Sequence, residues 1–134
     1  MKPYRILVTG SRDWPHLSVV IRALDEARAT VPHGQPVIVV HGDCPNGADR
    51  FAKTWARRNS AHGITEEAHP AQWRVNGTLD RSAGFRRNAD MVDLGANLCL
   101  AFIRNGSRGA SHTAALAERA GIPVRRYTAQ PDAR

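Results

Sequence analysis

The chain has 134 residues, which is enough for one domain with one hydrophobic core. Hydrophobic residues make up 42% and charged residues 23%, as in ordinary globular proteins, and no apolar run approaches the ~20 residues of a membrane span. The net charge of +7 keeps nucleic acid among the partners to consider, but the chain carries no helix-turn-helix, RNA-recognition or zinc-finger signature.

The cysteines and the N-terminus narrow the class of protein further. Cys44 and Cys99 are too few and too badly spaced for a disulfide scaffold or a zinc site. The chain also lacks HExxH and CxxC elements, so no metal is expected, and no cofactor is expected either. The chain begins directly with a strand pattern, which argues against a signal peptide. We therefore expect a cytoplasmic protein without a membrane partner. Its basic residues are nearly all arginine, which suits phosphate recognition and also follows from a GC-rich genome.

The first third of the chain predicts a strand and a helix. Tyr4–Thr9 has the apolar run of a buried strand, and the strand is expected to end at Gly10. Asp13 is the candidate cap of the following helix, with Pro15 in its first turn. The helix itself is indicated by apolar residues at helical spacing: Leu17, Val20, Ile21, Leu24 and Ala27.

The middle of the chain repeats this alternation. The β-branched run Val37–His41 predicts a second strand, and Ile64–His69 predicts a shorter, more polar strand near a sheet edge. The range Pro70–Ala83 has no regular pattern and is long for a loop in a compact domain, so we expect it to form a lid or wall of a functional site. The helix between the two strands, Ala48–Asn59, is expected to bury Ala48, Phe51, Ala52, Trp55 and Ala56.

The last third predicts two more helices and two more strands. They are a helix over Gly84–Leu94 with Phe85, Ala89 and Val92 turned inward, a buried strand over Asn97–Ile103, a helix over Ser111–Ala120 and a strand over Val124–Tyr127. Residues 1–128 are therefore expected to form one domain, followed by a disordered tail over 129–134.

Alternating strands and helices predict an α/β fold with an about five-stranded, mainly parallel sheet and helices on both faces. In such sheets, ligands bind beyond the carboxyl ends of the strands, where the strand order reverses. Glycine-rich loops follow three of the predicted strands. We therefore expect these loops to meet at one site.

The loop after the first strand has the residues of an anion site. Gly10 allows a sharp turn and a close approach of the backbone to a ligand. Ser11 carries a hydroxyl group, and Arg12 can pair with phosphate. A glycine in this position is also common in an ordinary turn, so the motif does not decide the function alone.

The loop after the second strand runs from His41-Gly42-Asp43 to Gly47-Ala48-Asp49 at a helix start. It lacks the Lys-Ser/Thr pair of a Walker A loop and the GxGxxG of a dinucleotide fingerprint. Asp49 either holds ribose hydroxyls or complements the positive end of the helix. His41 is expected to pack at the strand end, and Cys44 has no nearby base that would make it a nucleophile.

Two later motifs each allow two interpretations. In Gly84-Phe85-Arg86-Arg87-Asn88, the last two residues either reach into a cleft or belong to a solvated basic face, while Arg86 faces solvent. The stretch Asn105-Gly106-Ser107-Arg108-Gly109-Ala110-Ser111 is either a phosphate cradle at a helix start or a capped helix with a flexible beginning.

Taken together, these residues resemble the YspA-type, cpYpsA-related branch of the SLOG superfamily, whose relatives include the LOG-type phosphoribohydrolases and the DprA Rossmann domain. The matching pieces occur in the same order and cover nearly the whole chain. They are Val8-Thr9-Gly10-Ser11-Arg12-Asp13-Trp14; Val40-His41-Gly42 with Gly47-Ala48-Asp49 and Ala52; Trp73 with Ala83-Gly84, Arg87-Asn88 and Met91; and Ser107 and Gly109 with Ala117 and Gly121-Ile122-Pro123-Val124.

The resemblance implies a three-layer modified Rossmann fold that binds nucleotides or nucleotide derivatives, with the glycine loops taking phosphate or ribose. Arg87 matches the arginine of the RKxxM element of LOG enzymes. In those enzymes a GGxGTxxE element supplies a glutamate that acts on the N-glycosidic bond, and here Thr113 stands in its place. Glu118 lies further along the same helix and should point elsewhere. By analogy with LOG relatives, a homodimer is expected.

The leading hypothesis is a domain that binds a nucleotide-like small molecule, such as one related to ADP-ribose or NAD, as a sensor in bacterial or phage signalling or conflict systems. The first alternative is an N-glycosidase of nucleoside monophosphates, with Arg87 and Asp49 as candidate catalytic residues. The second is a DprA-like nucleic-acid binder, which the charge of +7 motivates. The predicted ligand-binding residues are Gly10, Ser11, Arg12, Gly42, Asp43, Gly47, Ala48, Asp49, Trp73, Arg87, Asn88, Asn105, Gly106, Ser107, Gly109, Ala110 and Ser111.

Overall fold

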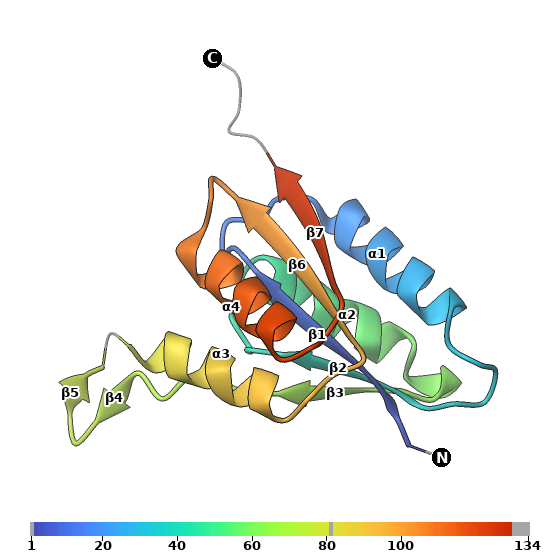
Figure 1. The fold of residues 1–134 in the computed structure, drawn as a ribbon, viewed down its shortest axis with the longest axis horizontal. Helices are drawn as coiled ribbons and strands as arrows, with labels where there is room; N and C mark the ends of the chain where they lie inside the picture. Colours follow the sequence, from blue (N-terminus) through green and yellow to red (C-terminus); the bar gives the residue numbers. More distant parts are fainter. Residues whose placement is uncertain (1, 81, 130–134) are drawn as a thin grey trace.

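The computed structural model describes residues 2–80 and 82–129 (Figure 1). Strands and helices alternate through these residues, apart from one short antiparallel hairpin. In chain order the elements are β1 (Tyr4–Gly10), α1 (Leu17–Ala29), β2 (Val37–His41), α2 (Ala48–Arg58), the 3-10 turn η1 (Ser60–His62), β3 (Ile64–Ala68), β4 (Arg74–Val75), β5 (Thr78–Leu79), α3 (Ala83–Asp93), β6 (Leu98–Arg104), α4 (Arg108–Arg119) and β7 (Val124–Ala129).

The main sheet has five parallel strands in the order β3-β2-β1-β6-β7. From β1 the chain adds β2 and β3 on one side and then crosses over to add β6 and β7 on the other. The strand order therefore reverses between β1 and β6, where Ile6 pairs with Leu98 and Gly10 with Phe102. The predicted α/β fold with a parallel sheet is confirmed, and β3 lies at a sheet edge, as its polar sequence predicted.

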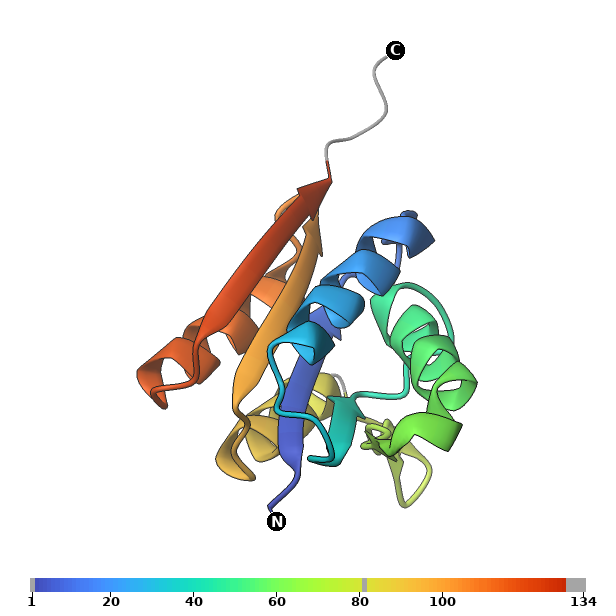
Figure 2. The same ribbon diagram turned by 90° about the vertical axis from the view of Figure 1, so that its right-hand side faces the viewer.

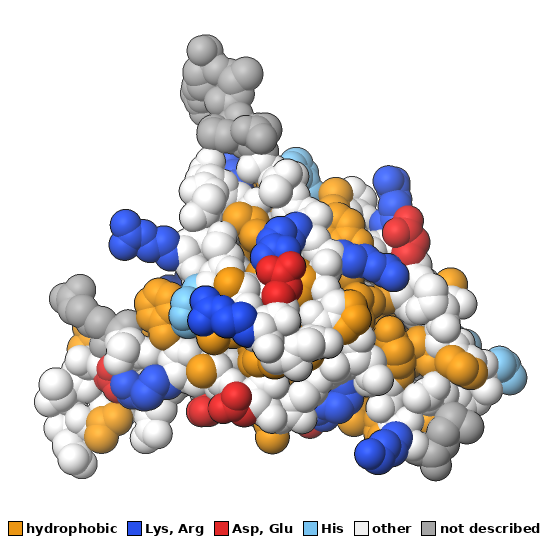
Figure 3. Space-filling model, viewed as in Figure 1, with side chains coloured by type: hydrophobic (Ala, Val, Ile, Leu, Met, Phe, Trp, Pro, Cys, Tyr) orange, Lys and Arg blue, Asp and Glu red, His pale blue; other side chains and the backbone are white. Residues whose placement is uncertain are grey.

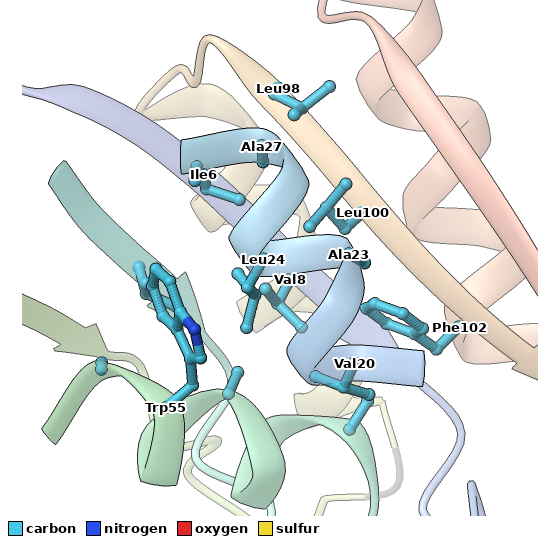
Figure 4. Packing of buried hydrophobic residues seen from close by; sticks show 14 of the residues in the cluster. Ile6, Val8, Val20, Ala23, Leu24, Ala27, Trp55, Leu98, Leu100 and Phe102 are labelled. Atoms are coloured by element: carbon cyan, nitrogen blue, oxygen red, sulfur yellow. The ribbon is translucent and has the colours of Figure 1, made fainter. Parts of the chain in front are cut away.

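Helices cover both faces of the sheet, so the fold has three layers and is Rossmann-like (Figure 2). Helices α1 and α2 pack on one face, where Figure 4 shows the side chains of α1 lying over those of β1 and β6, with Trp55 of α2 beside them. Helices α3 and α4 cover the other face, where Met91 and Ala117 pack with Leu7 and Cys99. Fully burying one large aliphatic side chain contributes about 1.5–3 kcal/mol, so the two cores hold the central strands firmly.

Helix α1 begins later than the sequence predicts. Its N-cap is His16, so Asp13 does not cap the helix and Pro15 lies before it. The reason is Trp14, which turns back toward the core: its backbone N–H donates to Ser11 O (3.1 Å), its indole N–H donates to His16 O (3.0 Å), and its ring lies 5.5 Å from that of Phe102. Burying this indole in a turn delays the start of the helix.

The other end of the chain also differs from expectation. Strand β7 continues to Ala129, so the expected tail loses its first residue to the sheet. The rest of that predicted tail, residues 130–134, lies outside the described residues.

The predicted loop Pro70–Ala83 contains the β4–β5 hairpin, which extends away from the body of the molecule (Figure 1). Asn76 and Gly77 form its tip with φ of +53° and +79°. Asn-Gly is the favoured pair for a two-residue hairpin turn in which both residues have positive φ. We call residues 73–80 the arm.

Candidate functional site

A cleft of about 330 Å³ opens at the carboxyl edge of the sheet, at the point where the strand order reverses. This volume lies in the range of about 300–1,000 Å³ that is usual for small-molecule sites. The loops after β1, β2 and β6 all reach it, as predicted, together with the arm and the start of α3. The lining residues are Val8, Thr9, Gly10, Ser11, Arg12, Asp13, Gly42, Cys44, Asp49, Trp73, Gly84, Phe85, Arg87, Asn88, Met91, Ser107, Gly109 and Ala110.

The β1 turn at the floor of the cleft packs closely against the start of α2. A Cβ atom on Gly10 would lie 2.4 Å from the Cβ of Ala48, and one on Gly47 would lie 2.3 Å from Ser11 O. Gly47 also has φ +76° and ψ −149°, a conformation that is essentially open only to glycine. Gly47 and Ala48 do not line the cleft, but they contact Ser11 and Gly10 of the β1 turn, which do.

Ser11 ties the two central strands together. Its N–H donates to Phe102 O (2.9 Å) and its hydroxyl oxygen accepts the backbone N–H of Arg104 (2.9 Å). The side chain is 3% exposed, so much of its hydrogen-bonding capacity is used inside the protein. Ser11 lines the cleft, but its first role is to hold the β1 turn against the end of β6.

Asp49 is a buried carboxylate in the cleft wall. It is 6% exposed, and its Oδ2 accepts the backbone N–H of Cys44 at 3.2 Å. Burial raises the pKa of Asp49, while the bond from Cys44 and the nearby His41 and Arg87 act in the opposite direction. The carboxylate of Asp49 therefore holds the loop before α2 through the N–H of Cys44, in addition to lying at the positive end of that helix. A buried acid with a shifted pKa in a cleft is a typical feature of a functional site.

His41 packs as predicted. It is 0% exposed, its Nε2 lies 2.7 Å from a carboxylate oxygen of Glu66, and its Nδ1 accepts the N–H of Asp43 at 3.0 Å. This second bond fixes the loop after β2. Asp43 was predicted to bind ligand, but its carboxylate pairs with Lys53 and it does not line the cleft.

Arg87 is held in place by three acceptors. Its Nη1 donates to Gly42 O and to His69 O (3.1 Å), and its Nε donates to Asn88 Oδ1 (2.7 Å). A Cβ on Gly42 would lie 2.5 Å from Nη1, so the glycine makes room for the guanidinium. Arg87 and Asn88 both line the cleft, whereas Arg86 is exposed, as predicted. Nη2 of Arg87 and Nδ2 of Asn88 make no hydrogen bond to a described residue.

The start of α4 forms the side of the cleft next to β6. The helix begins at Arg108, with Ser107 as N-cap, and not at Ser111 as predicted. The Ser111 N–H already bonds to Ser107 O (3.1 Å), so the cradle consists of residues 107–110. Asn105 and Gly106 form a turn with φ of +54° and +62°, and neither they nor Ser111 line the cleft.

Trp73 and Phe85 form an aromatic wall on the remaining side. Trp73 is 37% exposed, and the Cζ of Arg12 lies 5.1 Å from its ring centroid. The prediction that Phe85 turns inward is wrong: it is 42% exposed and contacts the ring of His112 edge-on at 5.4 Å. The buried face of α3 instead passes through Asn88 and Met91, which turns Phe85 toward the cleft and solvent.

Several lining residues were missing from the predicted set. They are Val8, Thr9, Asp13, Cys44, Gly84, Phe85 and Met91. Helical spacing could have found two of them, because Gly84 and Met91 lie one turn before and after Arg87 and Asn88. In the described part of the chain, no cluster of three or more His, Cys, Asp or Glu could hold a metal ion, and no helix is long and apolar enough to cross a membrane.

Comparison with known protein families identifies the relatives of this chain. Residues 4–75 match the family described as YspA, cpYpsA-related SLOG. The chain belongs to this family. It is also 40% identical over 129 residues to the Gene 61 protein of Mycobacterium phage D29, a match that covers 95% of this chain and 98% of the relative. No solved structure matches the chain significantly.

Membership of the SLOG family indicates a general role in binding nucleotide-related ligands. The structure also shows where this SLOG chain differs from the LOG pattern. Thr113 is 0% exposed, and its hydroxyl donates to Gly109 O (2.9 Å) within α4. Glu118 points away from the cleft, as predicted, and pairs with Arg126 of β7 (2.9 and 2.6 Å). Neither residue lines the cleft.

Proposed function

We propose that the cleft binds a nucleotide or nucleotide derivative, with ADP-ribose and NAD-related molecules as leading candidates, and that the protein is a ligand-binding sensor domain that acts as a homodimer in the cytoplasm. The observation that carries the proposal is the position of one oriented guanidinium, that of Arg87, opposite a helix start in a cleft between β1 and β6.

Phosphate has a suitable environment on the β1 and β6 side of the cleft. The first-turn amides of α4 have no acceptor within the helix, and the positive end of the helix favours an anion. Arg87 offers Nη2, and the exposed Arg12 can turn toward the same region. Arginine also matches phosphate geometry better than lysine does.

The sugar has a suitable partner in Asp49. A carboxylate accepts hydrogen bonds from a ribose diol, and Asn88 Nδ2 can donate to a ring or base oxygen. Asp49 is already buried without a ligand, so the free-energy cost of removing its carboxylate from water arises on folding and not on binding. A ligand hydroxyl would recover some of that cost.

Binding without turnover is favoured by the contacts of α4. In this chain Thr113 is locked inside the helix and Glu118 is paired with β7, so neither supplies a carboxylate to the cleft. The buried Asp49 supports one second candidate function, cleavage of a nucleoside monophosphate at the N-glycosidic bond. Free base released from AMP and abolished by Asp49→Ala would establish that activity; absence of release at high enzyme concentration would exclude it.

A DprA-like role is less well supported. On the face shown in Figure 3, Lys and Arg side chains are separated by neutral and acidic ones, without the continuous basic stripe that follows a nucleic-acid backbone. Binding to single strands with a steep dependence on salt would favour that role over ours.

The proposal is tested by thermal unfolding with NAD, ADP-ribose, cyclic ADP-ribose, AMP and cyclic dinucleotides. A ligand at a hundred times its dissociation constant stabilises the folded state by about 2.7 kcal/mol. Arg87→Ala should remove the shift. Arg86→Ala is the matched control and should keep it, because Arg86 is exposed and pairs with Asp80 and Ser82. A flat response of the folded protein to the whole panel would contradict the proposal.

A further inference from the structure

Trp73 differs from the other two tryptophans of the chain. Trp14 and Trp55 are each 2% exposed and belong to the core, whereas Trp73 is 37% exposed and lines the cleft. Its ring therefore contributes little to the core. An indole that stays accessible inside a cleft is a ready surface for another planar group.

Two contacts position the Trp73 ring. The backbone carbonyl of Trp73 accepts the N–H of Asp80 (2.6 Å), which closes the base of the arm. The edge of its ring lies on the first turn of α3, where a Cβ on Gly84 would be 3.0 Å from Cη2. The absence of a side chain at Gly84 thus lets the indole lie close to the helix.

One face of this ring is covered by Arg12. The guanidinium carbon lies 5.1 Å from the ring centroid. Arg12 is exposed and belongs to the β1 turn, directly after the residues that form the floor. A planar guanidinium stacks on an aromatic ring much as a nucleobase does. The contact is exposed, so it is easily exchanged for a better one.

We infer that Trp73 is the stacking platform for the heteroaromatic base of the ligand, and that Arg12 covers this platform only until the base replaces it. This inference rests on the proposed function. The displaced Arg12 remains within the β1 turn and pairs with the ligand phosphate. The subsite takes planar heteroaromatic rings in general, because every base offers a π face, so it selects for the presence of a base more than for its identity.

The test compares ligands with and without a base. Titration calorimetry is carried out with AMP, ADP-ribose and ribose 5-phosphate on the wild-type protein, Trp73→Leu and Trp73→Phe. Trp73→Leu keeps apolar bulk but removes the ring, and we expect it to weaken AMP and ADP-ribose roughly 5- to 100-fold while leaving ribose 5-phosphate unchanged. Trp73→Phe, which keeps an aromatic ring, should retain most of the affinity for AMP and ADP-ribose that Trp73→Leu loses. Thermal unfolding without ligand checks that each variant is folded.

Fluorescence gives an independent readout. The emission of Trp73, taken as the difference between the wild-type protein and Trp73→Phe, should be quenched by AMP and not by ribose 5-phosphate. Equal weakening of AMP and ribose 5-phosphate by Trp73→Leu, or no change in either, would overturn the inference while leaving the proposed function standing. Failure of all three ligands to bind the wild-type protein would instead count against the proposed function, and with it against this subsite.

Discussion

The two rims of the cleft are built in different ways. The body rim, residues 10–13 and 107–110, is held by backbone hydrogen bonds between central strands, such as Ser11 N–H to Phe102 O at 2.9 Å. The arm rim, Trp73 with Gly84 and Phe85, is held by side-chain contacts, and its two aromatic rings are 37% and 42% exposed. Under the proposed function, the main chain therefore faces the phosphate, a group common to all nucleotides, and side chains face the base.

The comparison predicts that glycine substitutions differ sharply between the body and the arm. Gly47 and Gly77 have nearly equal φ, +76° and +79°, but a Cβ on Gly47 would collide with Ser11 O, whereas one on Gly77 meets nothing within 4 Å. Gly47→Ala should therefore cost roughly 2–6 kcal/mol of unfolding free energy and Gly77→Ala about 1 kcal/mol. Urea unfolding measures both values, and similar losses would show that the contact supporting the body rim at Ser11 is no tighter than the tip of the arm.

Arg87 joins α3, and so the arm rim, to the ends of β2 and β3. Arg87→Ala removes the bonds to Gly42 O, His69 O and Asn88 Oδ1, and we expect a loss of about 1.5–3 kcal/mol because the guanidinium is charged and half-buried. Arg87→Lys should recover only part of this unfolding free energy, because one ammonium group cannot reproduce the planar set of donors of the guanidinium. Chemical denaturation checks this, with Arg86→Ala as the control; a loss below 0.5 kcal/mol for Arg87→Ala would contradict it.

The ion pair between β3 and β1, at the end of β3 that leads into the arm, should be sensitive to acid. Glu67 of β3 accepts two bonds from Arg5 (3.0 and 2.8 Å) and one from His69 (2.7 Å), and these partners, Arg5 first, lower its pKa to about 2. A lowered pKa stabilises the folded state above the ordinary value of 4.5, and this stability is lost as the pH falls toward 2. Because Glu67 is 34% exposed, solvent screening reduces the contribution to about 1 kcal/mol.

Glu67→Gln tests this contribution. At pH 7 it should lower the unfolding free energy by about 1 kcal/mol, and the difference from the wild-type protein should shrink between about pH 5 and pH 2. Urea unfolding across this range gives the measurement. A difference that does not depend on pH would mean that the ion pair between Glu67 and Arg5 does not stabilise the folded domain.

The smallest effect is expected for the exposed contact between Arg12 and Trp73, which joins the two rims. Arg12 and Trp73 form an exposed cation–π pair, so Arg12→Ala should change the unfolding free energy by no more than about 0.5–1 kcal/mol. A double-mutant cycle with Trp73→Leu isolates the coupling energy. Coupling well above 1 kcal/mol would show that the arm is a fixed part of the body.

Much of the body could be predicted from the sequence because its signals are local. Buried parallel strands appear as continuous apolar runs, such as Val37–Val40, and each strand of the main sheet was placed to within a residue or two. The convergence of the loops followed from the parallel order alone. The start of α4 was placed too late because Gly109 is a poor helix former and hid the first turn.

The arm rim was harder to predict because its contacts join distant residues. Its strands have two residues each, too few to show an alternating pattern, although Asn76-Gly77 is a recognisable turn signal. Nothing in local spacing brings Arg12 to Trp73 or Arg87 to Gly42. Asp43 is among the predicted ligand-binding residues, but its carboxylate pairs with Lys53 on α2 and it does not line the cleft.

The exposed arm also has a consequence for protein engineering. All residues from 72 to 79 are exposed, and a Cβ added at Gly77 in the tip would meet nothing within 4 Å. Surface hairpin tips of this kind tolerate insertion and exchange. Under the proposed function, longer or differently composed tips grafted between Arg74 and Leu79 should leave the floor and Trp73 in place and alter which ligands the cleft accepts.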